Sequence, residues 1–102
     1  MKLRDLLSGF SYKIEKGRED IGVTELVFDS RKLIQGAVFV CISGAVHDGH
    51  EYAAAAVEAG AAAIIAEHEV EVADGVCLVV CKSTREALAC MSAAYLTIRQ
   101  RN

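Results

Sequence analysis

The sequence lacks several features that mark large classes of protein. Its 11 lysine and arginine residues are scattered and are outnumbered by 14 acidic residues, which leaves a formal net charge of -3. Nucleic-acid-binding proteins usually carry a basic stripe, so this charge distribution argues against nucleic acid as a partner. The longest alanine-rich segment, residues 52–66, is interrupted by Glu58 and Gly60, which leaves it short of a membrane-spanning helix. The N-terminus MKLRDLLSGF is too charged for a signal peptide, so we expect a cytoplasmic protein with no membrane partner.

Patterns that bind nucleoside triphosphates or metal ions are also missing. The sequence contains no GxxxxGK followed by serine or threonine, and therefore no P-loop. The histidines at positions 47, 50 and 68 do not have the spacing of a metalloprotease, and the pair at 47 and 50 lacks a third ligand. We therefore expect no metal site.

The cysteines do not suggest catalysis either. They stand at positions 41, 77, 81 and 90, and no two of them form a CxxC pair. Cys77 and Cys81 lie four residues apart in an apolar run, where both would point to one side of a strand, so buried reduced thiols are the better interpretation. A dyad of Cys41 with a nearby histidine is conceivable, but a thiol inside the run VFVCI is usually buried and inert. We therefore assign no catalytic residue.

What the sequence does contain is the composition and patterning of one globular domain. Its 102 residues are 53% hydrophobic and 25% charged, and no internal repeat is visible. The unbroken apolar run at residues 38–42 is typical of a strand covered on both faces, and Ser83 and Glu86 have the spacing of a capping box. Strands are predicted at 12–14, 25–28, 38–42, 61–66 and 76–80, and helices at 3–7, 51–59 and 83–99. This order predicts an α/β fold, a small mixed β-sheet of four to five strands flanked by helices.

Two polar loops follow predicted strands, which is where ligands collect in such sheets. The first, FDSRK, offers the hydroxyl of Ser30 to a flat heterocycle and the charges of Arg31 and Lys32 to a phosphate. Taken alone, the same residues are also ordinary: Asp29 and Ser30 favour turns, and the two cations suit a solvated surface.

The second loop, SGAVHDGH, lies between a predicted strand and a predicted helix. Gly44 and Gly49 allow a close approach of the backbone to a ligand, and His50 stands at the first turn of the helix, where free amides attract anions. A diphosphate held in this way needs no basic patch. The alternative is structural, with Asp48 as a helix N-cap, Gly49 as a turn residue and both histidines at the surface.

Together the two loops resemble a known family. The pattern FDSRK, VFVCISG, DGH, an aromatic residue and GAAAIIAE, with the ending STREALACMSAAY, is similar to the N-terminal domain of the Mur ligases. The likeness runs from about Leu3 to Tyr95 and is strongest to the branch that adds the third amino acid, meso-diaminopimelate or lysine, to UDP-N-acetylmuramoyl-L-alanyl-D-glutamate.

This resemblance implies that the chain binds the UDP end of a UDP-N-acetylmuramoyl-dipeptide. Ser30 would contact the uracil, and Phe28 would line its pocket. The full set of substrate-binding residues implied is Phe28, Ser30, Arg31, Ala45, Val46 and His47. The residues expected to shape the two loops are Asp29, Gly44, Asp48, Gly49 and His50.

The resemblance also implies what this chain does not do alone. Similar proteins use ATP and magnesium to phosphorylate a carboxylate that an amine then attacks, and the residues for that step lie on a P-loop domain. We therefore expect an excised or truncated domain, separated from the ATPase and C-terminal domains, that holds no cofactor and does not catalyse. Two alternatives stay open: the matching domain of the ligase that adds D-alanyl-D-alanine, and a freestanding ligand-binding or interaction module.

Overall fold

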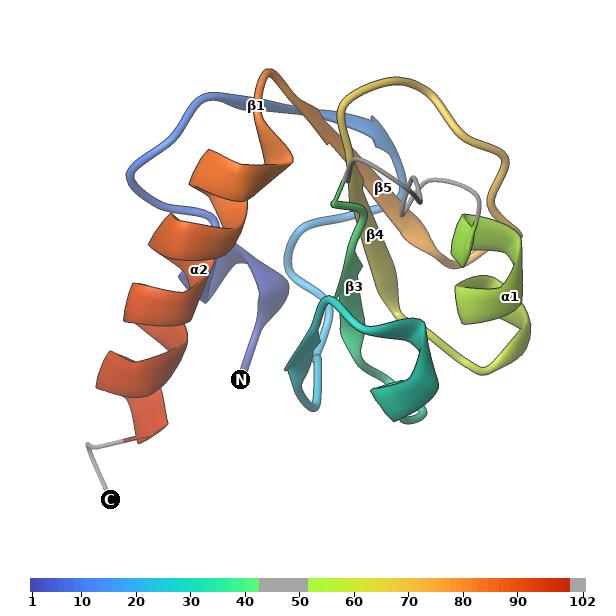
Figure 1. Cartoon of the computed structure of the whole chain (residues 1–102), viewed down its shortest axis with the longest axis horizontal. Coiled ribbons are helices and arrows are strands. Elements are labelled where there is room, and N and C mark those ends of the chain that lie inside the picture. Colours follow the sequence, from blue (N-terminus) through green and yellow to red (C-terminus); the bar gives the residue numbers. More distant parts are fainter. Residues whose placement is uncertain (43–51, 100–102) are drawn as a thin grey trace.

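A computed structural model describes residues 1–42 and 52–99, which form a sheet with helices on both faces (Figure 1). The sheet has five strands in the order β1-β5-β4-β3-β2, so it is the mixed sheet that the sequence predicts. The strands are β1 (Tyr12–Lys16), β2 (Leu26–Val27), β3 (Val38–Val40), β4 (Ala63–Ala66) and β5 (Cys77–Cys81). The helices are the 3-10 turns η1 (Leu3–Asp5) and η2 (Ser30–Lys32) and the α-helices α1 (Ala53–Glu58) and α2 (Thr84–Arg99).

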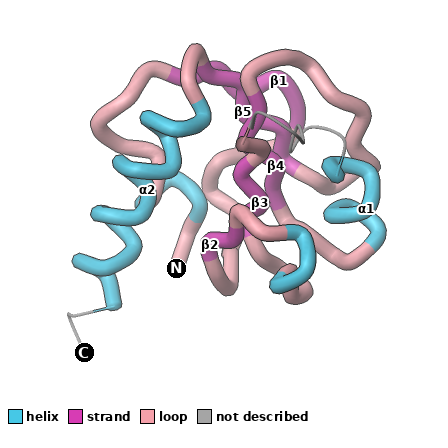
Figure 2. Tube along the Cα trace, in the orientation of Figure 1, coloured by secondary structure: helices cyan, strands magenta, loops and turns pink. Residues whose placement is uncertain are grey.

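Four of the five strands run in the same direction. β2, β3, β4 and β5 pair in parallel, and β1 is added antiparallel to β5 at one edge. Helix α1 connects β3 to β4 and lies on one side of the sheet, while α2 follows β5 and lies on the other (Figure 2). The carboxyl ends of the four parallel strands therefore share one edge of the sheet, and both candidate loops begin there.

The central strands are buried on both faces, as the apolar runs predict. Val38 and Val40 of β3 belong to the hydrophobic cluster that includes Met91 of α2. Phe39, between them, belongs to the cluster on the other face with Ala53 and Ala56 of α1. Helix α1 thus buries small side chains, which let it lie close to the sheet.

The N-terminal segment differs from the predicted helix. Leu3 and Leu6 are fully buried, as their spacing suggests, but the helical conformation is limited to the single 3-10 turn η1. The amide of Leu3 donates to the carbonyl of Ile21 at 2.9 Å, and that of Arg4 donates to Glu19 at 2.8 Å. These hydrogen bonds hold the N-terminal segment against residues 19–21. Because they use the amides of residues 3 and 4 in this way, the segment forms only one helical turn.

The start of α2 confirms one predicted cap and adds another. Ser83 Oγ accepts a hydrogen bond from the Glu86 amide at 3.2 Å, as the capping-box pattern predicts. In addition, Glu67 Oε2, just beyond β4, accepts from the Thr84 amide at 2.9 Å and from the Thr84 hydroxyl at 3.1 Å. A carboxylate at a helix N-terminus is favourable, because the free amides there carry partial positive charge.

The cysteine prediction is confirmed at three positions and wrong at one. Cys41, Cys77 and Cys81 are buried, whereas Cys90 is half-buried and its thiol lies 3.5 Å from the Gly9 carbonyl. Burial raises the pKa of Cys77 to about 11, so this thiol is protonated and unreactive at neutral pH. Within residues 1–42 and 52–99, no group of three or more His, Cys, Asp or Glu side chains is placed to hold a metal ion. In the same residues no helix is long and apolar enough to cross a membrane.

Candidate functional site

The first candidate loop begins beside the point where β3 ends. Val27 of β2 is paired with Phe39 of β3, so the chain leaves both strands at the same edge of the sheet. Adjacent strands lie roughly 4.8 Å apart, which puts the start of the FDSRK loop next to the last residues of β3. β2 is shorter than predicted and ends at Val27, which releases Phe28 from the sheet. The chain then forms η2, which lies on the same side of the sheet as α1 (Figure 1).

Phe28 is the exposed aromatic residue of this loop. Its side chain is 61% exposed, an unusual position for a phenylalanine in a chain with a well-formed core. It lines a cavity of about 220 Å³ together with residues of β2, and Asp29 and Lys32 complete the lining on the η2 side. Glu25 lines the cavity at the other end of β2. An aromatic face beside a small cavity can accept a flat ring by stacking.

Asp29 and Arg31 form a closely bonded pair in the same loop. Asp29 is the N-cap of η2, and its Oδ1 accepts hydrogen bonds from the Arg31 amide at 3.0 Å and from Arg31 Nε at 3.1 Å. Its Oδ2 accepts from Arg31 Nη2 at 3.0 Å. These bonds to Arg31 lower the pKa of Asp29 and raise the pKa of Arg31, so both groups stay ionised at neutral pH.

Tyr52 lies at the start of α1, the helix on the same side of the sheet as η2 (Figure 1). It is the N-cap residue of α1 and is 36% exposed. After the dominant effect of Asp29, the Tyr52 phenol also raises the pKa of Arg31 by a Coulombic interaction. Sequence reasoning noted an aromatic residue after DGH but gave it no role. The signal that could have singled it out is its position at a helix start on the edge where the parallel strands end.

We define the rim as Phe28, Asp29, Arg31 and Lys32. Three of these, Phe28, Asp29 and Arg31, were predicted site residues, and the structure brings them together. Ser30 is the first residue of η2, and its contact with a ligand stays a prediction. The remaining predicted positions lie outside the described residues, and their roles also stay predictions: Gly44, Ala45, Val46, His47, Asp48, Gly49 and His50.

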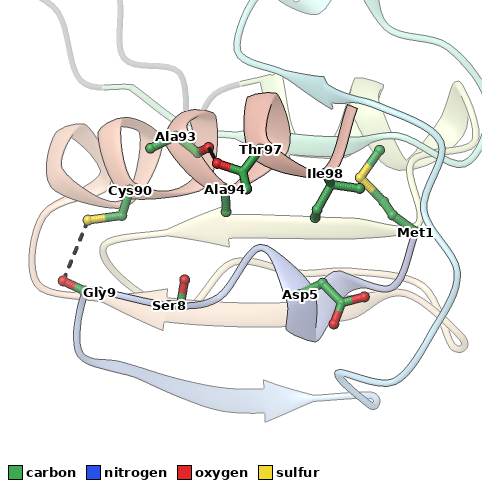
Figure 3. A pocket seen from close by; sticks show the side chains of 9 residues that line it. All are labelled: Met1, Asp5, Ser8, Gly9, Cys90, Ala93, Ala94, Thr97 and Ile98. Atoms are coloured by element: carbon green, nitrogen blue, oxygen red, sulfur yellow. Dashed lines mark hydrogen bonds between the residues drawn. The ribbon is translucent and has the colours of Figure 1, made fainter. Parts of the chain in front are cut away.

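A second, larger cavity lies on the α2 side and includes none of the predicted residues. It measures about 690 Å³, between the N-terminal segment and α2. Cys90, Ala94 and Ile98 project from α2 toward that segment (Figure 3). The smaller cavity is lined by the predicted residues Phe28 and Asp29 and by Lys32, so it is the better candidate for the nucleotide.

Comparison with known proteins points to one family. The chain matches the family described as "Mur ligase family, catalytic domain" over residues 22–99. The UDP-N-acetylmuramoyl-L-alanyl-D-glutamate--2,6-diaminopimelate ligase of Clostridium perfringens is 38% identical over 95 residues, which cover 93% of this chain and 20% of that ligase. The ligase of the same name from Bacillus licheniformis is 48% identical over 79 residues, which cover 78% of this chain and 16% of that ligase. The chain thus spans about a fifth of the length of these relatives.

Solved structures share the fold. The UDP-N-acetylmuramoylalanyl-D-glutamyl-2,6-diaminopimelate--D-alanyl-D-alanyl ligase of Acinetobacter baumannii superposes with a TM-score of 0.78 at 22% identity, over 91% of this chain and 21% of that one. The MurF ligase of Thermotoga maritima, solved in complex with ADP, has a TM-score of 0.63 at 30% identity, over 74% of this chain and 17% of that one. The chain therefore belongs to the Mur ligase family and has the α/β fold of the N-terminal domain of these enzymes.

Proposed function

We propose that this chain recognises the UDP end of UDP-N-acetylmuramoyl-dipeptide in a ligase that adds the third amino acid, meso-diaminopimelate or lysine. The observation that carries the proposal is Phe28, which leaves the sheet beside the end of β3 and lines a cavity next to cationic side chains. An aromatic face suits the uracil ring, and two adjacent cations suit a diphosphate. The proposal is also supported by the relatives at 38% and 48% identity, which carry the name of the diaminopimelate ligase.

The proposed roles divide the nucleotide between the two loops. Phe28 stacks on the uracil, and the Ser30 hydroxyl hydrogen-bonds to its polar edge. Arg31 and Lys32 face the phosphates. The second loop contributes Ala45, Val46 and His47 as contacts and Asp48, Gly49 and His50 as shaping residues, as the family resemblance implies. The same role makes the cytoplasm the expected location.

Titration with UDP tests the proposed site directly. Amide shifts in labelled protein should centre on residues 28–31 and 45–50. The dissociation constant should be roughly micromolar to millimolar, because UDP lacks the amino sugar and the peptide of the full substrate. Phe28→Ala and Ser30→Ala should each weaken binding. The matched control is Leu96→Ala, because Leu96 on α2 is 59% exposed, close to the 61% of Phe28. Equal weakening by Leu96→Ala, or shifts confined to α2, would contradict the proposed site and favour an interaction module of another kind.

The second part of the proposal is that the chain binds its substrate without catalysing. Activation of a carboxylate by ATP requires positioned phosphates and magnesium, and the 102-residue sequence has no P-loop to hold them. ATP and magnesium are thus proposed as cofactors of the longer ligases, supplied by their ATPase and C-terminal domains.

A turnover assay checks this absence of catalysis. A mixture of the chain with ATP, magnesium, diaminopimelate and UDP-N-acetylmuramoyl-dipeptide should release no phosphate above the rate without protein. A full-length diaminopimelate ligase serves as the positive control in the same assay. Phosphate release by the chain that depends on diaminopimelate would overturn the proposal.

A further inference from the structure

The Asp29–Arg31 pair presents its two partners unequally to solvent. The Arg31 side chain is 88% exposed, whereas the Asp29 side chain is 26% exposed. Asp29 also accepts the Arg31 backbone amide, so one carboxylate holds both ends of the same residue. The acid therefore lies beneath the guanidinium, and the cation is the group that solvent or a ligand meets.

The Asp29–Arg31 pair is not explained by its contribution to the stability of the fold. An exposed ion pair contributes little to the free energy of folding, because solvent screens it and two side chains lose freedom. A ligand gains more, since a side chain already held in its binding position need not be ordered when the ligand arrives. A guanidinium has five N–H donors, and Asp29 takes two of them, through Nε and Nη2. The other donors remain for an anion.

The neighbouring charges indicate where an anion fits. Lys32 follows Arg31 in η2, which adds a second cation beside the guanidinium. On the other side, Glu25 lines the cavity beside Phe28 and disfavours a phosphate inside it. The cavity thus suits an uncharged base, and the space outside it, beside Arg31, suits the phosphates.

We propose that Asp29 is a positioning residue that holds Arg31 as a preset contact for the phosphates of a nucleoside diphosphate. This inference rests on the proposed function, because the base must occupy the cavity beside Phe28. The pair then makes the site selective for UDP over uridine, since only the phosphorylated ligand reaches Arg31. Asp29 lines the cavity on the η2 side, and its effect on the phosphates comes through the orientation of the guanidinium.

The test compares the affinities for UDP and for uridine, measured by the same amide titration. The unmodified chain should bind UDP more tightly than uridine. Arg31→Gln should reduce that ratio by about 3- to 10-fold, the range expected for losing a charge-assisted contact at the surface. Asp29→Asn should reduce it by a similar factor. Arg31→Lys keeps the charge but loses the forked bond to Asp29, so it should restore only part of the ratio.

A double variant separates positioning from a general structural effect. If Asp29 acts through Arg31, Asp29→Asn should add little to the loss already caused by Arg31→Gln. Uridine binding should fall by less than UDP binding in every variant, and the amide spectrum outside η2 should stay unchanged. Equal losses for UDP and uridine in Asp29→Asn, or a ratio that no variant changes, would overturn the inference and leave the proposed function intact. Failure of the unmodified chain to bind either ligand would overturn the proposed function itself, and this inference with it.

Discussion

Replacing Phe39 by alanine is expected to lower the free energy of unfolding by about 3 to 5 kcal/mol. Phe39 lies in the centre of β3, is 1% exposed and packs in the cluster on the α1 face of the sheet. Five members of that cluster are alanines, which are too small to move into the space that a phenyl ring leaves: Ala37, Ala53, Ala56, Ala61 and Ala66. The loss should therefore fall at the upper end of the range. Urea unfolding followed by circular dichroism measures it.

Two further variants isolate the cause of this loss. Phe39→Leu keeps most of the buried volume and should cost less than about 1.5 kcal/mol. Phe28→Ala removes the same side chain from an exposed position and should change stability by no more than about 0.5 kcal/mol, while it weakens UDP binding. A loss below about 1 kcal/mol for Phe39→Ala, roughly the cost of deleting a single buried methylene, would contradict the packing of the α1 face.

Gly17→Ala should also be strongly destabilising, by about 2 to 5 kcal/mol. Gly17 directly follows β1 and has a φ of +80°, a left-handed conformation that costs alanine about 1 to 2 kcal/mol. A Cβ atom there would lie 2.8 Å from the Cys77 Cα and 3.1 Å from the Val76 carbonyl oxygen. Both contacts are with the backbone next to β5, so relief requires β1 and β5 to move apart.

Gly75→Ala is the matched control for this second prediction. Gly75 has a φ of +89°, close to that of Gly17, but a Cβ atom there would meet nothing within 4 Å. Its substitution should therefore cost only the conformational part, about 1 to 2 kcal/mol. The difference between the two variants in thermal or urea unfolding measures the steric contact with β5. Equal losses would show that no close approach exists between Gly17 and Cys77.

These stability predictions and the binding predictions involve different residues. Phe39 packs against α1 on one face of the sheet, and Gly17 lies against the backbone at Cys77. Phe28, Asp29 and Arg31 instead lie beyond the end of β2. A domain of this size has a stability of roughly 5 to 15 kcal/mol, so Phe39→Ala or Gly17→Ala can remove a large part of it. Substitutions at the rim should instead leave the unfolding curve nearly unchanged, and a loss of binding there can be read as a property of the site.

Much of the fold could be predicted because its signals are local. The unbroken apolar run of β3 indicates burial on both faces. Ser83 and Glu86 are three residues apart, so their cap is visible in the chain itself. The FDSRK loop was placed correctly after a strand for the same reason.

Other features depend on residues that are distant in the chain. Strand β1 pairs with β5 and not with its neighbour β2, and the Lys16–Leu78 pairing sets the close approach at Gly17. Glu67 caps α2 from 17 positions before Thr84. Cys90 faces the cavity beside Gly9, which is 81 positions away in the chain. No local pattern carries this information, because contacts of this kind form only when the whole sheet assembles.

The sequence by itself determined most of the strand and helix segments, the burial of the central strands, and the two loops that are proposed to bind a ligand. Only the tertiary structure decided the order of the strands, the second cap on α2, and the cavity that Phe28 lines with Glu25 and Lys32. The physical reason is the distance along the chain over which residues interact. Periodicity and capping depend only on residues that are a few positions apart. Strand order and the composition of a site are instead set by burial and hydrogen bonding between segments that meet only in the folded chain.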